Sequence, residues 1–303
     1  MKIFIPSPNE NWIVDRYIYE FKKYTTLSVV DNIKDADIIW FIAPWIWRKV
    51  DTKILESNEY KIVSTIHHID ESKKLEINNF VELDNYVDVY HASNRKVDEY
   101  IYEYTKKNIH FIPFWIDQNK WYKKDNLIEI KEKLHINESD FVIGSFQRDT
   151  ESKGFLKPKL SKGPDRLVEI YKYYNSMKNV LVILTGPKRN WIKRQLDKEG
   201  IRYLHFSTAD EDMLNEFYNI LDIYIVASRV EGGPQAIYEA ASVGINLIST
   251  DVGIANYLLD SESIFDMDNF KIAKPNKHFT NKIIKKHYLP YGIHYFDDFF
   301  RSL

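Results

Sequence analysis

The stretch SRVEGGPQAIYEAASVG, residues 228–244, decides the fold because it joins a strand to a helix through a glycine-rich loop. The apolar run DIYIVAS, residues 222–228, predicts a buried strand, and a helix is predicted from about Pro234 to Val243. The loop therefore lies at the carboxyl end of a strand, where open α/β sheets bind their ligands. Gly232 and Gly233 lack Cβ atoms, so a ligand can approach this backbone closely.

Strand and helix patterns alternate outward from this stretch in both directions, which implies parallel sheets with helices on both faces. The polar segment DQNKWYKKDN, residues 117–126, interrupts the alternation and is interpreted as a hinge. We predict an α/β fold of two Rossmann-like doubly wound domains, over residues 1–120 and 125–277, which face a central cleft. An aromatic tail over about 278–303 is expected to return to the first domain. TADE, residues 208–211, predicts a capping box with Thr208 as the N-cap.

Composition excludes several classes of function. The 303 residues carry a formal net charge of −2, which argues against duplex nucleic acid as a partner. The absence of cysteine excludes disulfides, thiolate metal sites and a cysteine nucleophile. The beginning of the sequence has no long apolar run, so no signal peptide is predicted and we expect a cytoplasmic protein.

The longest apolar run, residues 38–47, has about half of the ~20 residues that a membrane span needs. We interpret it as a buried strand that continues into a loop. Trp45 and Trp47, followed by Arg48 and Lys49, would also suit a membrane interface if exposed. Peripheral contact with the inner face of a membrane therefore stays open.

The charges around the glycine turn indicate what it binds. The first N–H groups of the predicted helix form a natural phosphate site. Glu231 beside that site would repel phosphate, so it is better suited to accept hydrogen bonds from hydroxyls, and Glu239 could bind a second set of hydroxyls. This combination matches a nucleotide diphosphate sugar. The alternative is that both glutamates are surface or capping residues.

The segment EGGPQAIYEA, residues 231–240, resembles the E-x7-E motif of retaining GT-B glycosyltransferases of the large family-four type. The resemblance implies that Glu231 contacts the donor sugar, that Glu239 contacts the ribose, and that Gly232 and Gly233 offer N–H groups to the sugar and phosphate. Many members have E-G-F-G where this chain has Pro234, which is tolerated at a helix start but removes one N–H donor.

The resemblance extends to FVIGSFQRD, residues 141–149, and KGPDRLVEIY, residues 162–171. It implies that an arginine and a lysine hold the diphosphate and offset the charge that builds on the leaving group. Arg148 is the arginine, and Lys162 is the preferred lysine because of its register to the following helix. TESKGFLKPKL, residues 150–160, is interpreted as an insertion, and it supplies the alternative lysines, Lys153 and Lys159.

In the first half, IVSTIHHID, residues 62–70, resembles the family's strand that ends in T-x-H. The resemblance implies that His67 lies near the transferred sugar, with His68 beside it on the acceptor side. A structural role for His67 is the alternative. FIPFWID, residues 111–117, resembles the family's I-P-N-G-V-D, with Phe114 and Trp115 in place of Asn and Gly, so Trp115 is a candidate for acceptor fit.

These features together predict a retaining glycosyltransferase that moves a hexose from a nucleotide diphosphate sugar to a hydroxyl of a glycan or lipid-linked acceptor. No cofactor and no metal ion are expected, because no D-x-D triplet stands at a strand end and the cations take over charge neutralisation. Two other functions stay open. One is a non-catalytic subunit that binds a nucleotide-sugar or glycan for a partner enzyme, and the other is a sugar-nucleotide epimerase on the same fold.

Overall fold

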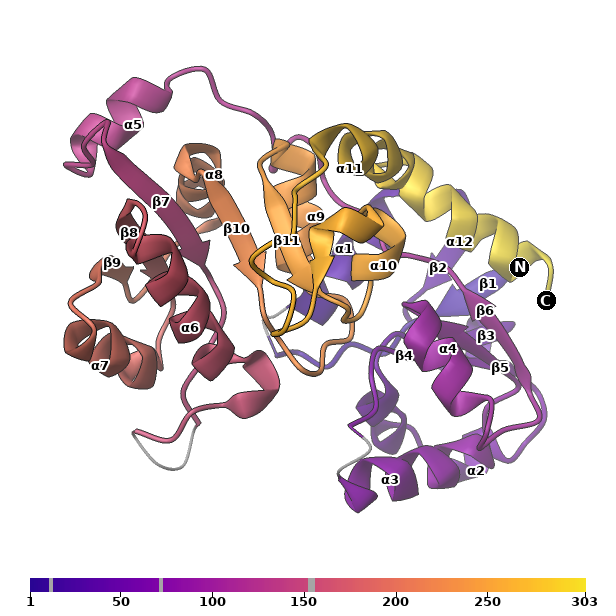
Figure 1. Ribbon diagram of the computed structural model, residues 1–303. Helices are drawn as coiled ribbons and strands as arrows, with labels where there is room; N and C mark the ends of the chain where they lie inside the picture. Colours follow the sequence, from indigo (N-terminus) through magenta and orange to yellow (C-terminus); the bar gives the residue numbers. More distant parts are fainter. Residues whose placement is uncertain (11–12, 71–72, 152–155) are drawn as a thin grey trace. The chain divides into compact units, whose positions relative to one another are not determined.

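The computed structural model describes residues 1–10, 13–70, 73–151 and 156–303 (Figure 1). The chain forms two compact units, of which the first comprises residues 1–115 and 286–303 and the second residues 116–285. The sequence places the return to the first domain at about residue 278, whereas the contacts place it at 285/286. No helix in the described ranges is long and apolar enough to cross a membrane.

The first unit is built on a six-stranded parallel sheet in the order β2-β1-β3-β4-β5-β6. Its strands are β1 (Lys2–Phe4), β2 (Ser28–Val30), β3 (Ile38–Phe41), β4 (Lys61–Ile66), β5 (Val89–Ala92) and β6 (Asn108–Phe111). Its helices are α1 (Ile13–Tyr24), α2 (Thr52–Leu55), α3 (Lys74–Asp84), α4 (Arg95–Ile101) and α12 (Tyr291–Arg301), with the 3₁₀ turns η1 (Ile33–Asp35) and η2 (Pro44–Lys49).

Aromatic side chains fill the core of the first unit. Trp40 of β3 packs edge-on against Phe21 of α1 and Phe300 of α12, with ring centroids 5.0 Å apart in both pairs. Because strand side chains alternate between the two faces of a sheet, Tyr90 and His91 of β5 point in opposite directions. His91 contacts Phe296 of α12, and Tyr90 contacts Phe80 of α3. The sheet is thus covered on both faces, as the buried strand patterns predict.

The second unit has a parallel sheet in the order β12-β11-β10-β7-β8-β9. Its strands are β7 (Asp140–Ser145), β8 (Asn179–Thr185), β9 (Arg202–Phe206), β10 (Ile223–Val226), β11 (Leu247–Thr250) and β12 (Ile264–Phe265). Its helices are α5 (Leu127–Lys133), α6 (Pro164–Asn175), α7 (Asn190–Lys198), α8 (Glu211–Ile220), α9 (Gln235–Val243), α10 (Ala255–Leu258) and α11 (Lys277–Ile284).

The strand order of the second unit reverses direction at β7, so the helices divide between the two faces. Helices α6 and α7 pack together on one face, while α8 packs with α5 and α9 (Figure 1). The carboxyl ends of β7 and β10 are neighbours, and this reversal is the position at which doubly wound sheets bind ligands.

Candidate functional site

The glycine-rich loop connects the end of β10 to the start of α9, as the sequence predicts. Ser228 at the beginning of the loop is fully buried. The Thr250 hydroxyl at the end of β11 donates to the Ser228 carbonyl over 2.7 Å, which ties the loop to the neighbouring strand. Gly253 also supports the loop, because a Cβ at this position would lie 2.9 Å from Pro234 and 3.1 Å from the Gly232 carbonyl oxygen.

Helix α9 begins at Gln235, with Pro234 as its N-cap residue. Within the described part of the chain, no side chain caps this end of the helix by a hydrogen bond. Gly233 has open space where a Cβ would stand, so the turn leaves the helix start accessible on this side. The first N–H groups of a helix carry partial positive charge, which suits a phosphate group.

Lys162 lies in the 3₁₀ turn η3 (Leu160–Lys162), directly before Gly163 and helix α6. Gly163 has a φ of +63°, and a Cβ there would lie 1.9 Å from the carbonyl oxygen of Ala227. The absence of a side chain therefore lets this turn press against the end of β10. The contact brings Lys162 to the glycine-rich loop.

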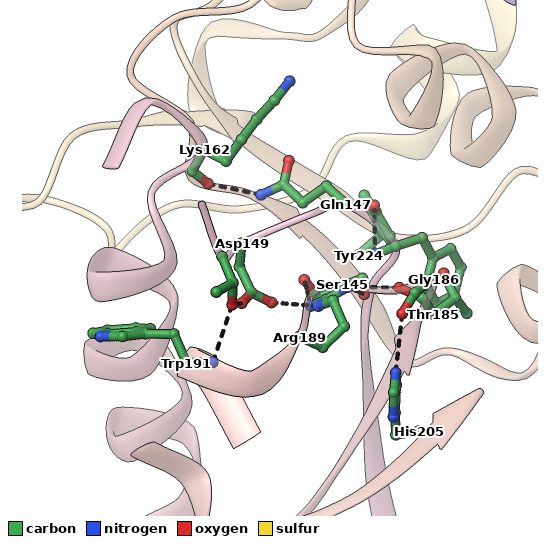
Figure 2. A network of polar contacts seen from close by, with 12 residues as sticks. Ser145, Gln147, Asp149, Lys162, Thr185, Gly186, Arg189, Trp191, His205 and Tyr224 are labelled. Atoms are coloured by element: carbon green, nitrogen blue, oxygen red, sulfur yellow. Dashed lines mark hydrogen bonds and ion pairs between the residues drawn. The ribbon is translucent and has the colours of Figure 1, made fainter. Parts of the chain in front are cut away.

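Glu231 and Lys162 form an ion pair, in which the Lys162 ammonium lies 2.5 Å from Glu231 Oε2. The Ser228 hydroxyl donates to the other carboxylate oxygen over 2.8 Å. Gln147, which follows β7, donates its amide to the Lys162 carbonyl over 2.7 Å (Figure 2). The amide oxygen of Gln147 lies 3.3 Å from Ser228 Oγ. Four side chains from three segments thus meet at the ends of β7 and β10.

The segment predicted to be an insertion, residues 150–160, begins and ends close to the end of β7. Thr150 pairs with Pro158 in an antiparallel bridge, and the Lys159 N–H donates to the Asp149 carbonyl over 2.7 Å. Lys159 is half-buried, and desolvation lowers the pKa of its ammonium, helped by the positive charges of Arg148 and Lys162. The structure therefore gathers these three cations, with Arg148 the most exposed. Lys153, the remaining candidate, lies outside the described residues.

Glu239 lies in α9, just over one turn beyond its start at Gln235. The Tyr218 hydroxyl of α8 donates to Glu239 Oε2 over 2.9 Å. Burial raises the pKa of Tyr218 well above its usual value, and the charge of Glu239 raises it further, so this phenol stays protonated and keeps its role as donor. The carboxylate is thus held by an aromatic neighbour and retains further acceptor capacity.

The two predicted histidines lie after β4 and line one pocket of the first unit. The pocket has a volume of about 260 Å³, and its wall includes Trp45, Arg48 and Asn79. His67 Nε2 lies 2.8 Å from the Ile42 carbonyl, and the imidazole stacks on Phe114 at 5.4 Å. Desolvation lowers the pKa of His67 to about 4. The ring is therefore neutral near pH 7, and its Nε2–H donates to the carbonyl.

His68 and Trp115 have contrasting environments. His68 is exposed at the pocket wall. Trp115 has no exposed surface, and its indole N–H donates to the Glu20 carboxylate over 2.8 Å. The indole is thus part of the core of the first unit, between α1 and α12, and offers no surface to an acceptor. We accordingly leave Trp115 out of the acceptor site.

Comparison with known proteins assigns the family. The sequence profile of the glycosyl transferases group 1 matches residues 126–285, which is more than half of the chain. The chain belongs to this family. A search of the curated proteins found no match.

Solved structures similar to this group 1 glycosyl transferase share its fold at low sequence identity. HepE from Anabaena, crystallised with UDP and glucose, has a TM-score of 0.77 and 13% identity, with both chains covered completely. A glycosyltransferase from Rickettsia africae has a TM-score of 0.72 and 14% identity, with 99% of this chain and 97% of that chain covered. Sucrose-phosphate synthase from Thermosynechococcus elongatus has a TM-score of 0.70 and 12% identity, with 98% of this chain and 80% of that chain covered. These similarities confirm the predicted GT-B fold.

Sequence reasoning missed a buried ion pair in this group 1 glycosyl transferase. Arg189, at the start of α7, pairs with Asp149, and both side chains are fully buried. The Arg189 guanidinium also donates to the carbonyls of Ser145 and Thr185 over 2.6 and 3.0 Å (Figure 2). It thereby joins the ends of β7 and β8. A signal existed in GPKR, residues 186–189, where Gly-Pro directly follows the end of β8 and an arginine comes two residues later.

Proposed function

We propose that the protein transfers a hexose from a nucleoside diphosphate sugar to a hydroxyl of a glycan or lipid-linked acceptor, with retention of anomeric configuration. The observation that carries this proposal is the cluster at the ends of β7 and β10. Arg148, Lys159 and Lys162 gather there beside the Glu231 carboxylate and the glycine-rich turn. Cations suit a diphosphate and carboxylates suit sugar hydroxyls, so one ligand that carries both groups satisfies the cluster.

UDP-glucose is the first donor to test. HepE from Anabaena, which shares the fold, was crystallised with UDP and with UDP-glucose. In the proposed complex, the diphosphate lies against Arg148, Lys162 and the start of α9. The sugar hydroxyls donate to Glu231, and the ribose hydroxyls donate to Glu239. Lys159 adds to the positive field, and Gly232 and Gly233 allow the close approach.

Charge stabilisation drives the proposed reaction. As the bond between the sugar and the diphosphate breaks, negative charge grows on the leaving phosphate, so fixed cations bind the transition state more strongly than the ground state. The acceptor attacks from the face that the phosphate leaves, and the phosphate takes the acceptor proton. This route needs neither a metal ion nor a protein base.

The acceptor site proposed is the pocket of the first unit. Its wall offers the indole of Trp45, which is 41% exposed, together with the neutral His67 and the exposed His68. Aromatic rings bind the apolar face of a sugar ring, and the surrounding polar groups can bind its hydroxyls. We place the reaction in the cytoplasm, where a lipid-linked acceptor would require contact with the inner face of the membrane.

The test is to incubate the protein with UDP-glucose and acceptor candidates and to measure UDP release and glycoside formation, with GDP- and ADP-sugars in parallel. We expect release with one nucleotide series and an unchanged rate after metal chelation. Arg148→Ala should lower turnover more than nucleotide affinity, whereas Lys157→Ala in the neighbouring insertion should change neither. Binding without release would instead favour the non-catalytic subunit, and absence of nucleotide binding would refute the proposal.

A further inference from the structure

The ion pair between Lys162 and Glu231 joins two groups that the proposed reaction uses separately. The Lys162 ammonium lies 2.5 Å from Glu231 Oε2, and the lysine and glutamate side chains are 27% and 8% exposed. This pair is better shielded from solvent than an ordinary surface pair, so its attraction is screened less by water and salt. Lys162 therefore already has an anionic partner within the protein.

A diphosphate at the glycine-rich turn competes with this partner. The phosphate oxygens gain most from Lys162 when the ammonium points toward them, but the adjacent Glu231 carboxylate attracts the same ammonium and repels the phosphate. An intact donor compensates for the loss of the pair, because its sugar hydroxyls can donate to the Glu231 carboxylate. A nucleoside diphosphate without the sugar offers no such hydroxyls.

We propose that Glu231 acts as a built-in competitor of the diphosphate for Lys162, and that the donor sugar removes this competition. This inference rests on the proposed function and adds a role in discrimination. Glu231 disfavours the nucleoside diphosphate product relative to the intact donor. After sugar transfer, the Lys162 ammonium returns to the carboxylate, which promotes release of the product.

The surroundings of the pair allow such an exchange without a change of fold. The backbone of Lys162 is held by the hydrogen bond from Gln147 and by the close contact of Gly163 with Ala227. Ser228, which donates to Glu231 over 2.8 Å, is itself fixed by the Thr250 hydroxyl. The backbones of both partners are thus anchored, and rotation of the Lys162 side chain alone separates the charges.

The test measures the dissociation constant of UDP by calorimetry for the wild type and for Glu231→Gln. Glutamine keeps the size of the side chain and can still accept from Ser228, but it carries no charge. Because a well-shielded pair is lost, we expect UDP to bind about fivefold more tightly to the variant, while UDP-glucose gains less or loses affinity. UDP should also become a stronger product inhibitor of any turnover that remains.

Two further variants separate this competition from a general effect of charge. Glu151→Gln removes a carboxylate whose charge also reaches Lys159, but it leaves the ion pair intact, so UDP affinity should change less than about twofold. In a Lys162→Gln background, Glu231→Gln should lose most of its effect, because the competition requires the lysine. If Glu231→Gln does not fold, Glu231→Ala replaces it in these measurements.

The outcomes distinguish this inference from the function on which it rests. Tighter UDP binding by Glu231→Gln that depends on Lys162 supports the competition. Unchanged or weaker UDP binding by a folded variant overturns it, and leaves the proposed transferase function standing. Failure of the wild-type protein to bind UDP, GDP or ADP overturns both.

Discussion

The backbone position of Lys162, unlike that of the neighbouring lysines, is fixed by the residue that follows it. Gly163 adopts a left-handed conformation and lies against the Ala227 carbonyl, so the backbone of Lys162 has one position relative to the end of β10. Lys159 is placed by the stem of the insertion instead, through its hydrogen bond to Asp149. The preference for Lys162 rests on the position of this lysine relative to α6, so it is a prediction about backbone geometry. The ion pair between Lys162 and Glu231 is consistent with that prediction.

Glu239 provides a prediction at the scale of one residue. If it binds the ribose, Glu239→Ala should weaken binding of UDP and of UDP-glucose by the same factor, because both ligands carry the ribose. Loss of hydrogen bonds to a carboxylate costs about 1.5–3 kcal/mol, which corresponds to roughly 10- to 150-fold in affinity. Calorimetric titration with both ligands measures the two factors.

Tyr218→Phe is the matched control for this variant. It removes the 2.9 Å hydrogen bond to Glu239 but keeps the carboxylate and the aromatic packing on Trp121. We expect a smaller loss of affinity than for Glu239→Ala, equal for both ligands. If UDP affinity is unchanged in Glu239→Ala, the ribose role is refuted.

Some site residues could be read from the sequence and others could not. Glu231 and Glu239 stand in a motif with fixed spacing, and the strand–helix transition places them. Arg189 was missed because a single arginine after a strand is usually exposed, whereas this one is fully buried and paired with Asp149. Trp115 was misjudged because aromatic residues serve cores and ligand sites alike, and its partner Glu20 is remote in sequence.

At the scale of elements, strands were predicted more accurately than helix ends. The apolar runs at residues 222–228 and 38–47 mark the strands β10 and β3, because burial on both faces leaves little freedom of composition. The capping box at Thr208 was wrong, since Asp210 caps α8 and accepts from the Met213 N–H over 2.8 Å. Both positions offer a side-chain oxygen before the same helix, and the choice depends on backbone angles that composition does not reveal.

The junction between η3 and α6 gives a prediction at this scale. Gly163→Ala should destabilise the protein by several kcal/mol, because it adds a steric clash with Ala227 to a left-handed strain of about 1 kcal/mol. It should also abolish transfer, because relief of the clash moves Lys162 away from Glu231. Thermal unfolding measures the loss of stability, and release of UDP from UDP-glucose measures the loss of transfer.

Gly200→Ala is the control for Gly163→Ala. Gly200 has a φ of +66°, similar to the +63° of Gly163, but a Cβ there meets no atom within 4 Å. Its cost should therefore be the strain alone, about 1 kcal/mol, with UDP binding unchanged. Equal destabilisation by the two substitutions would show that the contact with Ala227 is unimportant.

At the scale of the whole molecule, the parallel sheets could be predicted from the alternation of strand and helix patterns in the sequence. The buried histidines of the first unit could not. That unit buries His91 and His287 as well as most of His67. Desolvation is the largest cause that lowers their pKa values, to about 3 for His91 and about 4 for the other two. Hydropathy patterns do not predict the burial of these histidines, because histidine is also common on protein surfaces.

These histidines predict acid sensitivity. The unfolded chain takes up their protons near pH 6.5, whereas the folded protein does so only near pH 3–4, so the free energy of unfolding decreases as the pH falls through this window. Between pH 7 and pH 5 we expect a loss of roughly 1–2 kcal/mol per histidine. Circular dichroism melts at the two pH values measure it, and His91→Gln should have a smaller pH dependence. An identical dependence in wild type and variant would contradict this assignment.

The return of the chain to its first unit has a consequence for biosynthesis. Helix α12 supplies Phe296 and Phe300 to the core around Trp40, and Asp297 accepts hydrogen bonds from Thr25 and Thr26. During translation the second unit can fold as soon as residue 285 has emerged, while the earlier-made first unit still lacks its last helix. At about 5–20 residues per second, the ribosome leaves that aromatic core open for roughly 10–40 s. The first half of the nascent polypeptide should therefore be the part that chaperones bind.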